Sequence, residues 1–139
     1  MAQLTPTDVS EPAPRPHSTH PWRSKFYVAC RGIAFGVRGQ SSFRVHFAFA
    51  ILVPVAAAVL HCGAVEWCLL LGCIGLVLTT ELINSTVEML FRGLDDKARE
   101  RVWPCLDIAA GAVLVASLTA VVIGLIIFMP KLAAWLGVG

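Results

Sequence analysis

Residues 67–88 read WCLLLGCIGLVLTTELINSTVE, an almost wholly apolar run that ends in a polar segment. The apolar part, residues 67–78, is typical of a helix inside a lipid bilayer, which takes about 20 mostly apolar residues to cross. In the polar part, four residues recur at helical spacing: Glu81, Asn84, Ser85 and Glu88. An α-helix brings residues three, four and seven positions apart onto one face. The sequence therefore predicts a membrane helix with two acids and an amide pointing the same way near one end.

The two acids of this helix are candidates for function because of their depth. An acidic side chain near the middle of a bilayer costs about 2.5–3.5 kcal/mol on insertion scales and usually marks a functional site. Counting about 20 residues from Trp67 puts Glu81 roughly one turn inside the far boundary and Glu88 close to water. This placement suits chemistry between a lipid head group and a soluble substrate. The structural alternative is that both acids only hydrogen-bond neighbouring helices.

Composition places the whole chain in the membrane. Of its 139 residues, 57% are hydrophobic, and the mean hydropathy of +0.74 is too high for an ordinary soluble domain. The length allows one small domain, and no nucleic-acid partner is expected. Five cysteines, an odd number without a C-x-x-C pair, are interpreted as small packing residues.

The N-terminal part divides into a tail and a surface helix. Residues 1–22 contain five of the eight prolines and are predicted to be a disordered, Pro-rich tail. From Arg23 the apolar residues recur at helical spacing, with basic residues off the stripe, as in a short amphipathic helix lying in the membrane interface. The glycines of this segment permit close backbone approach. Residues 23–139 are expected to form the membrane domain.

Three membrane-spanning helices are predicted. The first is the apolar run of residues 47–60, extended from residue 43 or to residue 65, with Pro54 as a kink. His46 at its start is interpreted as an interfacial residue. A short connection leads to an antiparallel second span over residues 65–91. A charged aqueous loop is expected over residues 92–102, followed by a third span from Pro104 to Met129 that stops at Pro130 and Lys131.

Two patterns predict how these spans are oriented and packed. Ten of the eleven Lys and Arg residues precede the first span or lie within residues 92–102, so the positive-inside rule puts the N-terminus in the cytoplasm and the C-terminus outside. Small residues repeat every fourth position in the third span: Ala112, Ala116, Ala120 and Gly124. Such a stripe allows another helix to pack closely. Asp107 lies near the start of this span, where an acid can also cap a helix.

Several motifs in this order resemble the small bacterial integral-membrane lipid kinases, the family of diacylglycerol kinase and undecaprenol kinase. They are Phe26-x-x-Ala29-x-x-Gly32-Ile33, Phe43-Arg44-x-His46, Glu81-x-x-Asn84-Ser85-x-Val87-Glu88 and Asp107-Ile108-Ala109-Ala110-Gly111-Ala112-Val113-Leu114. The resemblance covers residues 26–130. It implies a homotrimer in the bacterial inner membrane that transfers the γ-phosphate of ATP to a lipid alcohol with Mg²⁺.

The resemblance also implies roles for individual residues. Glu81 would be the general base on the lipid hydroxyl, Glu88 a metal ligand, and Asn84 and Asp107 would help to order the site. A catalytically silent homologue that binds lipid or nucleotide, and a small ion-conducting protein using the two glutamates, are the alternatives. The pattern does not choose between diacylglycerol and undecaprenol.

The chain departs from the family pattern around the phosphates. Gln40 stands where the family carries a second metal-binding glutamate, and it can still offer a carbonyl oxygen to the cation. Leu106 replaces a lysine and cannot contact phosphate. Lys97, Arg99 and Arg101 are the expected substitutes for the missing positive charge, although all three can equally be solvated charges that follow the positive-inside rule.

Overall fold

The computed structural model describes residues 22–37 and 41–137, and the regular secondary structure of this part of the chain is all α-helix, without a strand. Four helices follow one another: α1 (Trp22–Val37), α2 (Ser41–Val59), α3 (Ala64–Arg92) and α4 (Asp96–Trp135). The all-α prediction is thereby confirmed. The tail predicted to be disordered, residues 1–22, lies outside the described residues except for Trp22, which belongs to α1. Gln40, the predicted metal ligand, also lies outside them.

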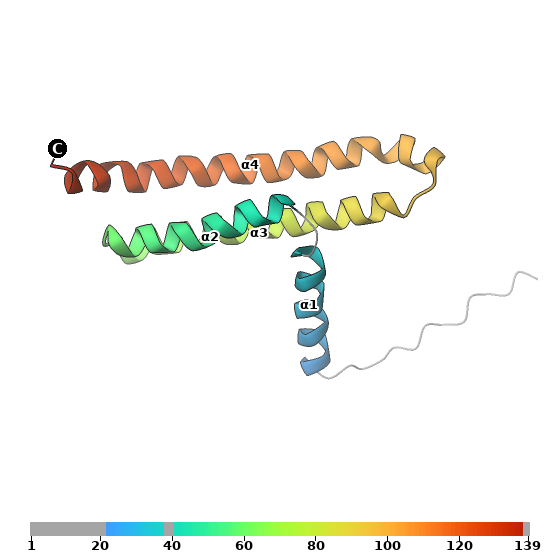
Figure 1. Cartoon of the computed structure of the whole chain (residues 1–139), viewed down its shortest axis with the longest axis horizontal. Coiled ribbons are helices and arrows are strands. Elements are labelled where there is room, and N and C mark those ends of the chain that lie inside the picture. The colour runs from blue at the N-terminus through green and yellow to red at the C-terminus, as the bar shows by residue number, and fades with distance from the viewer. Residues whose placement is uncertain (1–21, 38–40, 138–139) are drawn as a thin grey trace, which may run out of the picture.

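Helix α3 is the centre of the arrangement, because α1, α2 and α4 all contact it. Helices α2, α3 and α4 run side by side, and α1 stands roughly perpendicular to them (Figure 1). The turn between α2 and α3 contains His61, whose φ of 50° is in the left-handed region. Gly36 lets α1 approach α3, since a Cβ added there would lie 2.7 Å from Leu82 Cδ2. This confirms the close approach expected of a glycine in this segment.

The bounds of α3 agree with the second predicted span to within one residue. Gly63 caps its start, and the Gly63 N–H donates to Glu66 Oε2 at 2.6 Å. The same carboxylate oxygen lies 3.0 Å from Lys131 Nζ, which ties the beginning of α3 to the far end of α4. At 29 residues α3 is about 43 Å long, so part of it extends beyond a hydrocarbon core of about 30 Å.

The start of α4 differs from the sequence prediction. Only residues 93–95 separate α3 from α4, so most of the expected loop over residues 92–102 is helix. Asp95 provides the cap, with its side chain accepting from the Ala98 N–H at 2.9 Å. Hydropathy alone could not detect this helix because its first turns are charged, although Lys, Arg and Ala are good helix formers. Asp107 therefore lies inside α4, and the alternative that it caps a helix is wrong.

The end of α4 also differs from the prediction. The helix continues through Pro130 to Trp135, so Pro130 does not stop it. Membrane helices tolerate proline where neighbouring groups satisfy the freed backbone carbonyls. The 40 residues of α4 make it about 60 Å long, roughly twice the thickness of a hydrocarbon core. The aqueous environment expected for residues 92–102 stays a prediction.

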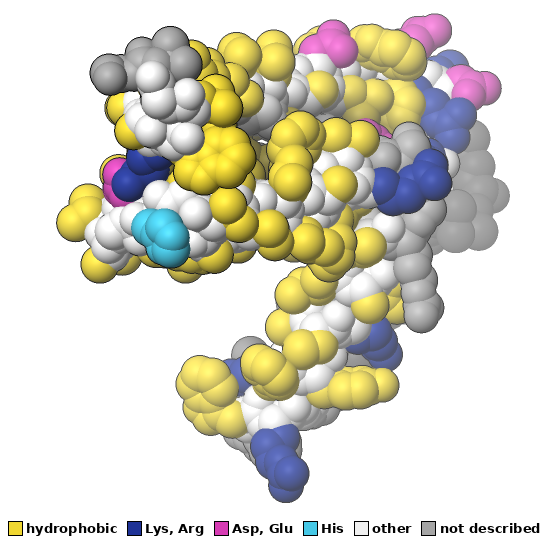
Figure 2. Space-filling model, turned by 60° about the vertical axis from the view of Figure 1, so that its left-hand side comes forward, with side chains coloured by type: hydrophobic (Ala, Val, Ile, Leu, Met, Phe, Trp, Pro, Cys, Tyr) yellow, Lys and Arg dark blue, Asp and Glu magenta, His cyan; other side chains and the backbone are white. Residues whose placement is uncertain are grey.

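Apolar side chains cover most of the surface of a single chain. Two helices, α3 and α4, are long and apolar enough to cross a membrane, and the apolar part of α2, Phe43–Val59, is shorter. Figure 2 shows hydrophobic side chains along the helices and charged ones gathered toward their ends. The core is correspondingly thin: Phe43, Ala57, Leu70, Val77, Ala116 and Ile127 are buried. The exposed apolar surface is what lipid, or further copies of the chain, would cover.

Candidate functional site

The polar end of α3 forms the candidate site. Glu81 and Ser85 are each 1% exposed and Asn84 is 8% exposed, which makes them the buried polar residues of the described chain. Glu88, one turn further on, keeps 33% of its side chain exposed. The shared face predicted from the spacing is confirmed: its first three residues are buried, and the last, Glu88, is partly exposed. One acid is thus buried among helices, while the next can meet a soluble ligand.

His46 of α2 contacts Glu81 from a neighbouring helix. Its Nε2 lies 3.8 Å from Glu81 Oε2, and its side chain is 20% exposed. The interpretation of His46 as a merely interfacial residue is incomplete, because it lines the buried acid. The available signal was its place in the Phe43-Arg44-x-His46 motif, but helical periodicity cannot report a contact between two helices.

A polar chain runs from Asn84 to Arg92 along α3. Asn84 Nδ2 donates to Glu88 Oε1 at 3.0 Å, and Arg92 Nη2 donates to Glu88 Oε2 at 3.1 Å. These contacts fix the orientation of the Glu88 carboxylate toward the polar end of the helix. Because the Asn84 amide uses its nitrogen on Glu88, its oxygen remains available as an acceptor or metal ligand.

The remaining candidate residues lie on α4 and are not drawn into this face. Asp107 is exposed in a single chain, and Leu106 is partly buried. Lys97 is exposed in the first turn of α4. With α3 and α4 antiparallel, Glu81 and Asp107 each lie about 12 residues, or about 18 Å, from the connecting turn. They therefore stand at a similar level along the two helices.

Arg99 has a structural role that the sequence did not indicate. Its Nη2 donates to Arg92 O at 2.8 Å and its Nε donates to Phe91 O at 3.4 Å. Its guanidinium carbon lies 5.9 Å from the centre of the Phe91 ring, and its Nη1 is 3.6 Å from Asp96 Oδ1. Arg99 thus binds the last carbonyls of α3, where a cation also complements the helix dipole.

The donor set fits a hard divalent cation that is also bound by a substrate. Magnesium is usually held by one or two carboxylates together with substrate phosphates, not by a complete protein cage. Glu88 places a partly exposed carboxylate at the end of the face, and the buried Asn84, one turn earlier, donates to it through its amide nitrogen. Within the described residues, no three His, Cys, Asp or Glu side chains cluster.

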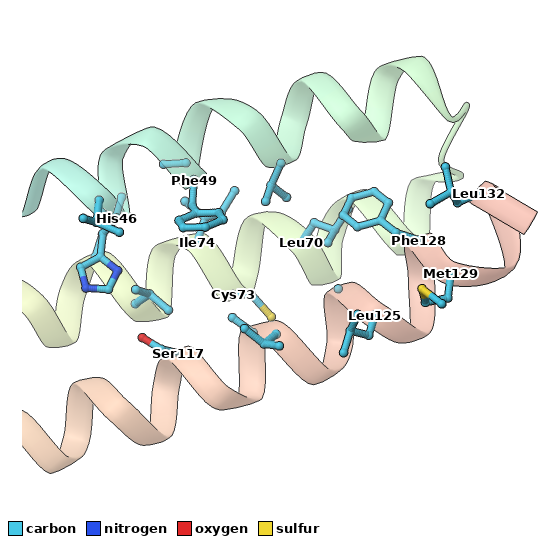
Figure 3. A pocket seen from close by; sticks show the side chains of 18 residues that line it. His46, Phe49, Leu70, Cys73, Ile74, Ser117, Leu125, Phe128, Met129 and Leu132 are labelled. Carbon is cyan, nitrogen blue, oxygen red and sulfur yellow. The ribbon is translucent and has the colours of Figure 1, made fainter.

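Two cavities adjoin the site. An apolar groove of about 370 Å³ lies between α2, α3 and α4, with His46 and Ser117 at one end and Met129 and Leu132 at the other (Figure 3). A second cavity of about 520 Å³ lies between α1 and α3, and Ser85 is among its lining residues. The oxygens Ser85 Oγ and Ser117 Oγ are buried and have no hydrogen-bond partner among the described residues.

Comparison with known proteins identifies the class. Residues 27–128 match the family model described as prokaryotic diacylglycerol kinase. The chain is 34% identical over 107 residues to the undecaprenol kinase of Bacillus subtilis, covering 77% of this chain and 87% of that protein. It is 29% identical over 139 residues to the diacylglycerol kinase of a Synechocystis species, covering 91% of this chain and 79% of the relative. The comparison with solved structures found no match.

The chain therefore belongs to the prokaryotic diacylglycerol kinase family, whose members are ATP-dependent lipid kinases. The resemblance read from the four motifs is confirmed. Family membership and the two long apolar helices together indicate integration in a membrane. ATP use, typically with a divalent metal, follows from the same membership.

Proposed function

We propose that this protein transfers the γ-phosphate of ATP to the hydroxyl of a membrane lipid alcohol, with Mg²⁺, at the polar end of α3. The observation that carries the proposal is the placement of Glu81 and Glu88 on one helical face, one buried and one partly exposed. Phosphoryl transfer needs an oriented hydroxyl, a metal and positive charge, and little covalent chemistry from the protein. The two environments on this face suit a lipid acceptor and an aqueous donor, respectively.

Glu81 acts as the general base on the lipid hydroxyl. Its carboxylate is surrounded by helices, and the neighbouring His46 imidazole restricts its orientation. A base must lie within hydrogen-bond reach of the proton that it accepts, and a lipid hydroxyl entering beside His46 meets this carboxylate. The proton leaves the hydroxyl oxygen for a Glu81 carboxylate oxygen as that hydroxyl oxygen attacks the γ-phosphorus and ADP departs.

The donor side of the site is assembled at the exposed end of the face. Glu88 would hold the metal, assisted by the Asn84 amide oxygen and by Gln40. A magnesium ion bound there would supply positive charge that neutralises the triphosphate. Asp107 helps to order the site, and Lys97 and Arg99 supply positive charge near the phosphates. The short distance along the chain from Glu88 to the first turn of α4 supports this grouping.

A trimeric, three-span arrangement completes the proposal. In it, α2 forms the remaining span, the N-terminus and the α3–α4 turn face the cytoplasm of a bacterial inner membrane, and α1 lies in the interface. Support comes from the ten-to-one division of basic residues and from the large apolar surface of one chain. In a homotrimer, a second copy of the chain would bring further donors to the metal.

The direct test is transfer of labelled phosphate from ATP onto a panel of lipid alcohols by the purified protein. Lipid-dependent formation of a labelled lipid phosphate is expected, with ADP produced in equal amount. Glu81→Gln keeps the shape of the side chain but removes the base, so transfer should fall by about 10²–10⁴-fold while expression and assembly persist. Full turnover by Glu81→Gln would refute the general-base role of Glu81. A folded protein inactive on every lipid would instead be a silent homologue.

A further inference from the structure

Both oxygens of the Glu88 carboxylate, the proposed metal ligand, accept hydrogen bonds from side chains of α3. Oε1 accepts from Asn84 Nδ2 at 3.0 Å, and Oε2 accepts from Arg92 Nη2 at 3.1 Å. The two donors differ in their freedom to move. Asn84 is 8% exposed, whereas 70% of the Arg92 side chain is exposed. A cation that binds Glu88 therefore meets a buried amide that stays in place and a guanidinium that can leave.

A divalent cation on this carboxylate would displace Arg92. Magnesium binds oxygen at about 2.0–2.1 Å and demands near-ideal octahedral geometry, so it would have to share Oε2 with a positively charged guanidinium. Like charges at such short range repel strongly where the surroundings are partly desolvated. Asn84 carries no charge and can keep its hydrogen bond to Oε1. The ion pair between Glu88 and Arg92 is thus a resting arrangement that metal binding would end.

The backbone at Arg92 is fixed, while its side chain is exposed. Arg99 Nη2 donates to Arg92 O at 2.8 Å, and the Gly93 N–H donates to Leu90 O at 3.1 Å. These bonds hold the end of α3 at its turn into α4. When the guanidinium leaves Glu88, it therefore moves about a fixed point and stays close to any ligand that binds beside this carboxylate.

The other cations at this end of the molecule are less suited to bind a phosphate closely. Arg99 is bound to the last carbonyls of α3 and lies 3.6 Å from Asp96. Lys97 is exposed, but its ammonium is a point charge without the planar fork of a guanidinium. Leu106 offers only hydrocarbon. Arg92 presents a guanidinium fork directly beside the proposed metal ligand, and this fork matches two oxygens of one phosphate.

We propose that Arg92 binds the terminal phosphate of Mg-ATP and gives up Glu88 as it does so. In the resting protein its guanidinium neutralises Glu88. When the metal nucleotide is bound, Glu88 faces the cation and Arg92 donates N–H groups to oxygens of the γ-phosphate. A diphosphate lacks the group that attracts Arg92 away from Glu88, so Arg92 also selects ATP over ADP. This inference rests on the proposed kinase function and assigns a further nucleotide-binding residue to it.

Nucleotide binding tests the inference without catalysis. The probes are AMP-PNP, a triphosphate analogue that is not transferred, and ADP, each titrated with Mg²⁺ into the purified protein in lipid nanodiscs and followed by calorimetry. Arg92→Gln should raise the Kd of AMP-PNP about 5- to 30-fold and that of ADP less than about twofold, since one charged hydrogen bond at an exposed site is lost. Arg92→Lys keeps the charge without the fork and should recover part of the affinity. Equal losses for both nucleotides, or no loss, would overturn the inference.

Arg31 of α1 provides a matched charge control. It is exposed and does not line the cavity between α1 and α3. Arg31→Gln removes the same charge as Arg92→Gln but should leave the Kd of AMP-PNP near that of the wild type. The unfolding temperature should stay the same in both variants, because both side chains are exposed. Similar losses of affinity in the two variants would mean that only the overall charge attracts the nucleotide, and this would overturn the inference.

The exchange of Glu88 for phosphate is tested by a double-mutant cycle without metal. In the absence of Mg²⁺, Glu88→Gln releases Arg92 and should lower the Kd of AMP-PNP about threefold or more. In the Arg92→Gln background the same change should have a smaller effect, because no guanidinium is left to release. An equal gain in both backgrounds would come from the lost charge of Glu88 alone and would overturn the exchange. Competition between Arg92 and the cation is a separate effect, visible in the Mg²⁺ dependence at saturating ATP.

The outcomes distinguish this inference from the proposed function. A protein that binds AMP-PNP through Arg92 but phosphorylates no lipid contradicts the lipid kinase function only. A protein that phosphorylates lipid with the same KM for ATP in the wild type and in Arg92→Gln contradicts the role of Arg92 only. Failure of the folded protein to bind either nucleotide would contradict both.

Discussion

His46 Nε2 lies 3.8 Å from Glu81 Oε2 across the contact between α2 and α3. The carboxylate is 1% exposed and the imidazole 20%, and His46 also lines the apolar groove. A buried acid of this kind keeps a fixed geometry only when groups on other helices define it. The contact therefore links the lipid side of the molecule to the residue proposed to accept the proton.

The first prediction concerns this contact. His46→Leu should lower kcat about 10-fold, equivalent to about 1.4 kcal/mol of activation free energy, because Glu81 loses a partner that orients it. His46→Gln retains a side-chain N–H and should recover most of the activity. Steady-state kinetics of both variants at saturating ATP and lipid check this. Equal activity of His46→Leu and wild type would show that His46 only fills space.

The second prediction concerns Arg92, which occupies one oxygen of the proposed metal ligand Glu88 at 3.1 Å. Arg92→Gln should lower the Mg²⁺ concentration for half-maximal activity, because cation and guanidinium no longer compete for the carboxylate. The shift should be about two- to fivefold, since exposed ion pairs contribute about 0–1 kcal/mol. Arg92→Lys keeps the charge, so its Mg²⁺ concentration for half-maximal activity should lie between those of Arg92→Gln and the wild type. A higher Mg²⁺ requirement in Arg92→Gln would contradict this competition.

The third prediction concerns packing on α4. Ala116 is 5% exposed, so Ala116→Leu overpacks a filled contact and should cost about 1–3 kcal/mol of stability. Ala112, one turn earlier in the same stripe, is exposed in a single chain and provides the control. The unfolding temperature in detergent should be lowered by Ala116→Leu and not by Ala112→Leu. If Ala112→Leu alters the oligomer size, the outward part of the stripe contacts another subunit.

The sequence predicts well the features that depend on one helix at a time. The bounds of α3 and the shared face of Glu81, Asn84 and Ser85 follow from hydropathy and the helical period alone, and both are confirmed. The proximity of His46 to Glu81 could not be predicted in this way. It depends on how α2 lies against α3, and a periodicity within one helix carries no information about that.

The beginning of α4 shows a second limit. Hydropathy treats the charged residues after Arg92 as loop, whereas Asp95 starts a helix there. A local signal was present, because Asp95 as an N-cap followed by the acidic Asp96 in the first turn is typical of a helix N-terminus. The role of Arg99 could not be predicted even with this signal. Its contacts with Phe91 and Arg92 require the chain to reverse direction within three residues.

The last prediction separates the two cations proposed to face the phosphates. Lys97→Gln removes an exposed charge and should raise the KM for Mg-ATP severalfold without changing stability. Arg99→Gln should raise this KM and also lower the free energy of unfolding by about 1–2 kcal/mol, because its guanidinium donates to two backbone carbonyls at the end of α3. ATP titrations and thermal unfolding measure the two effects independently. A stability loss in Arg99→Gln without a change in KM would assign Arg99 to the helix terminus alone, and an unchanged KM in both variants would mean that neither cation contacts the nucleotide.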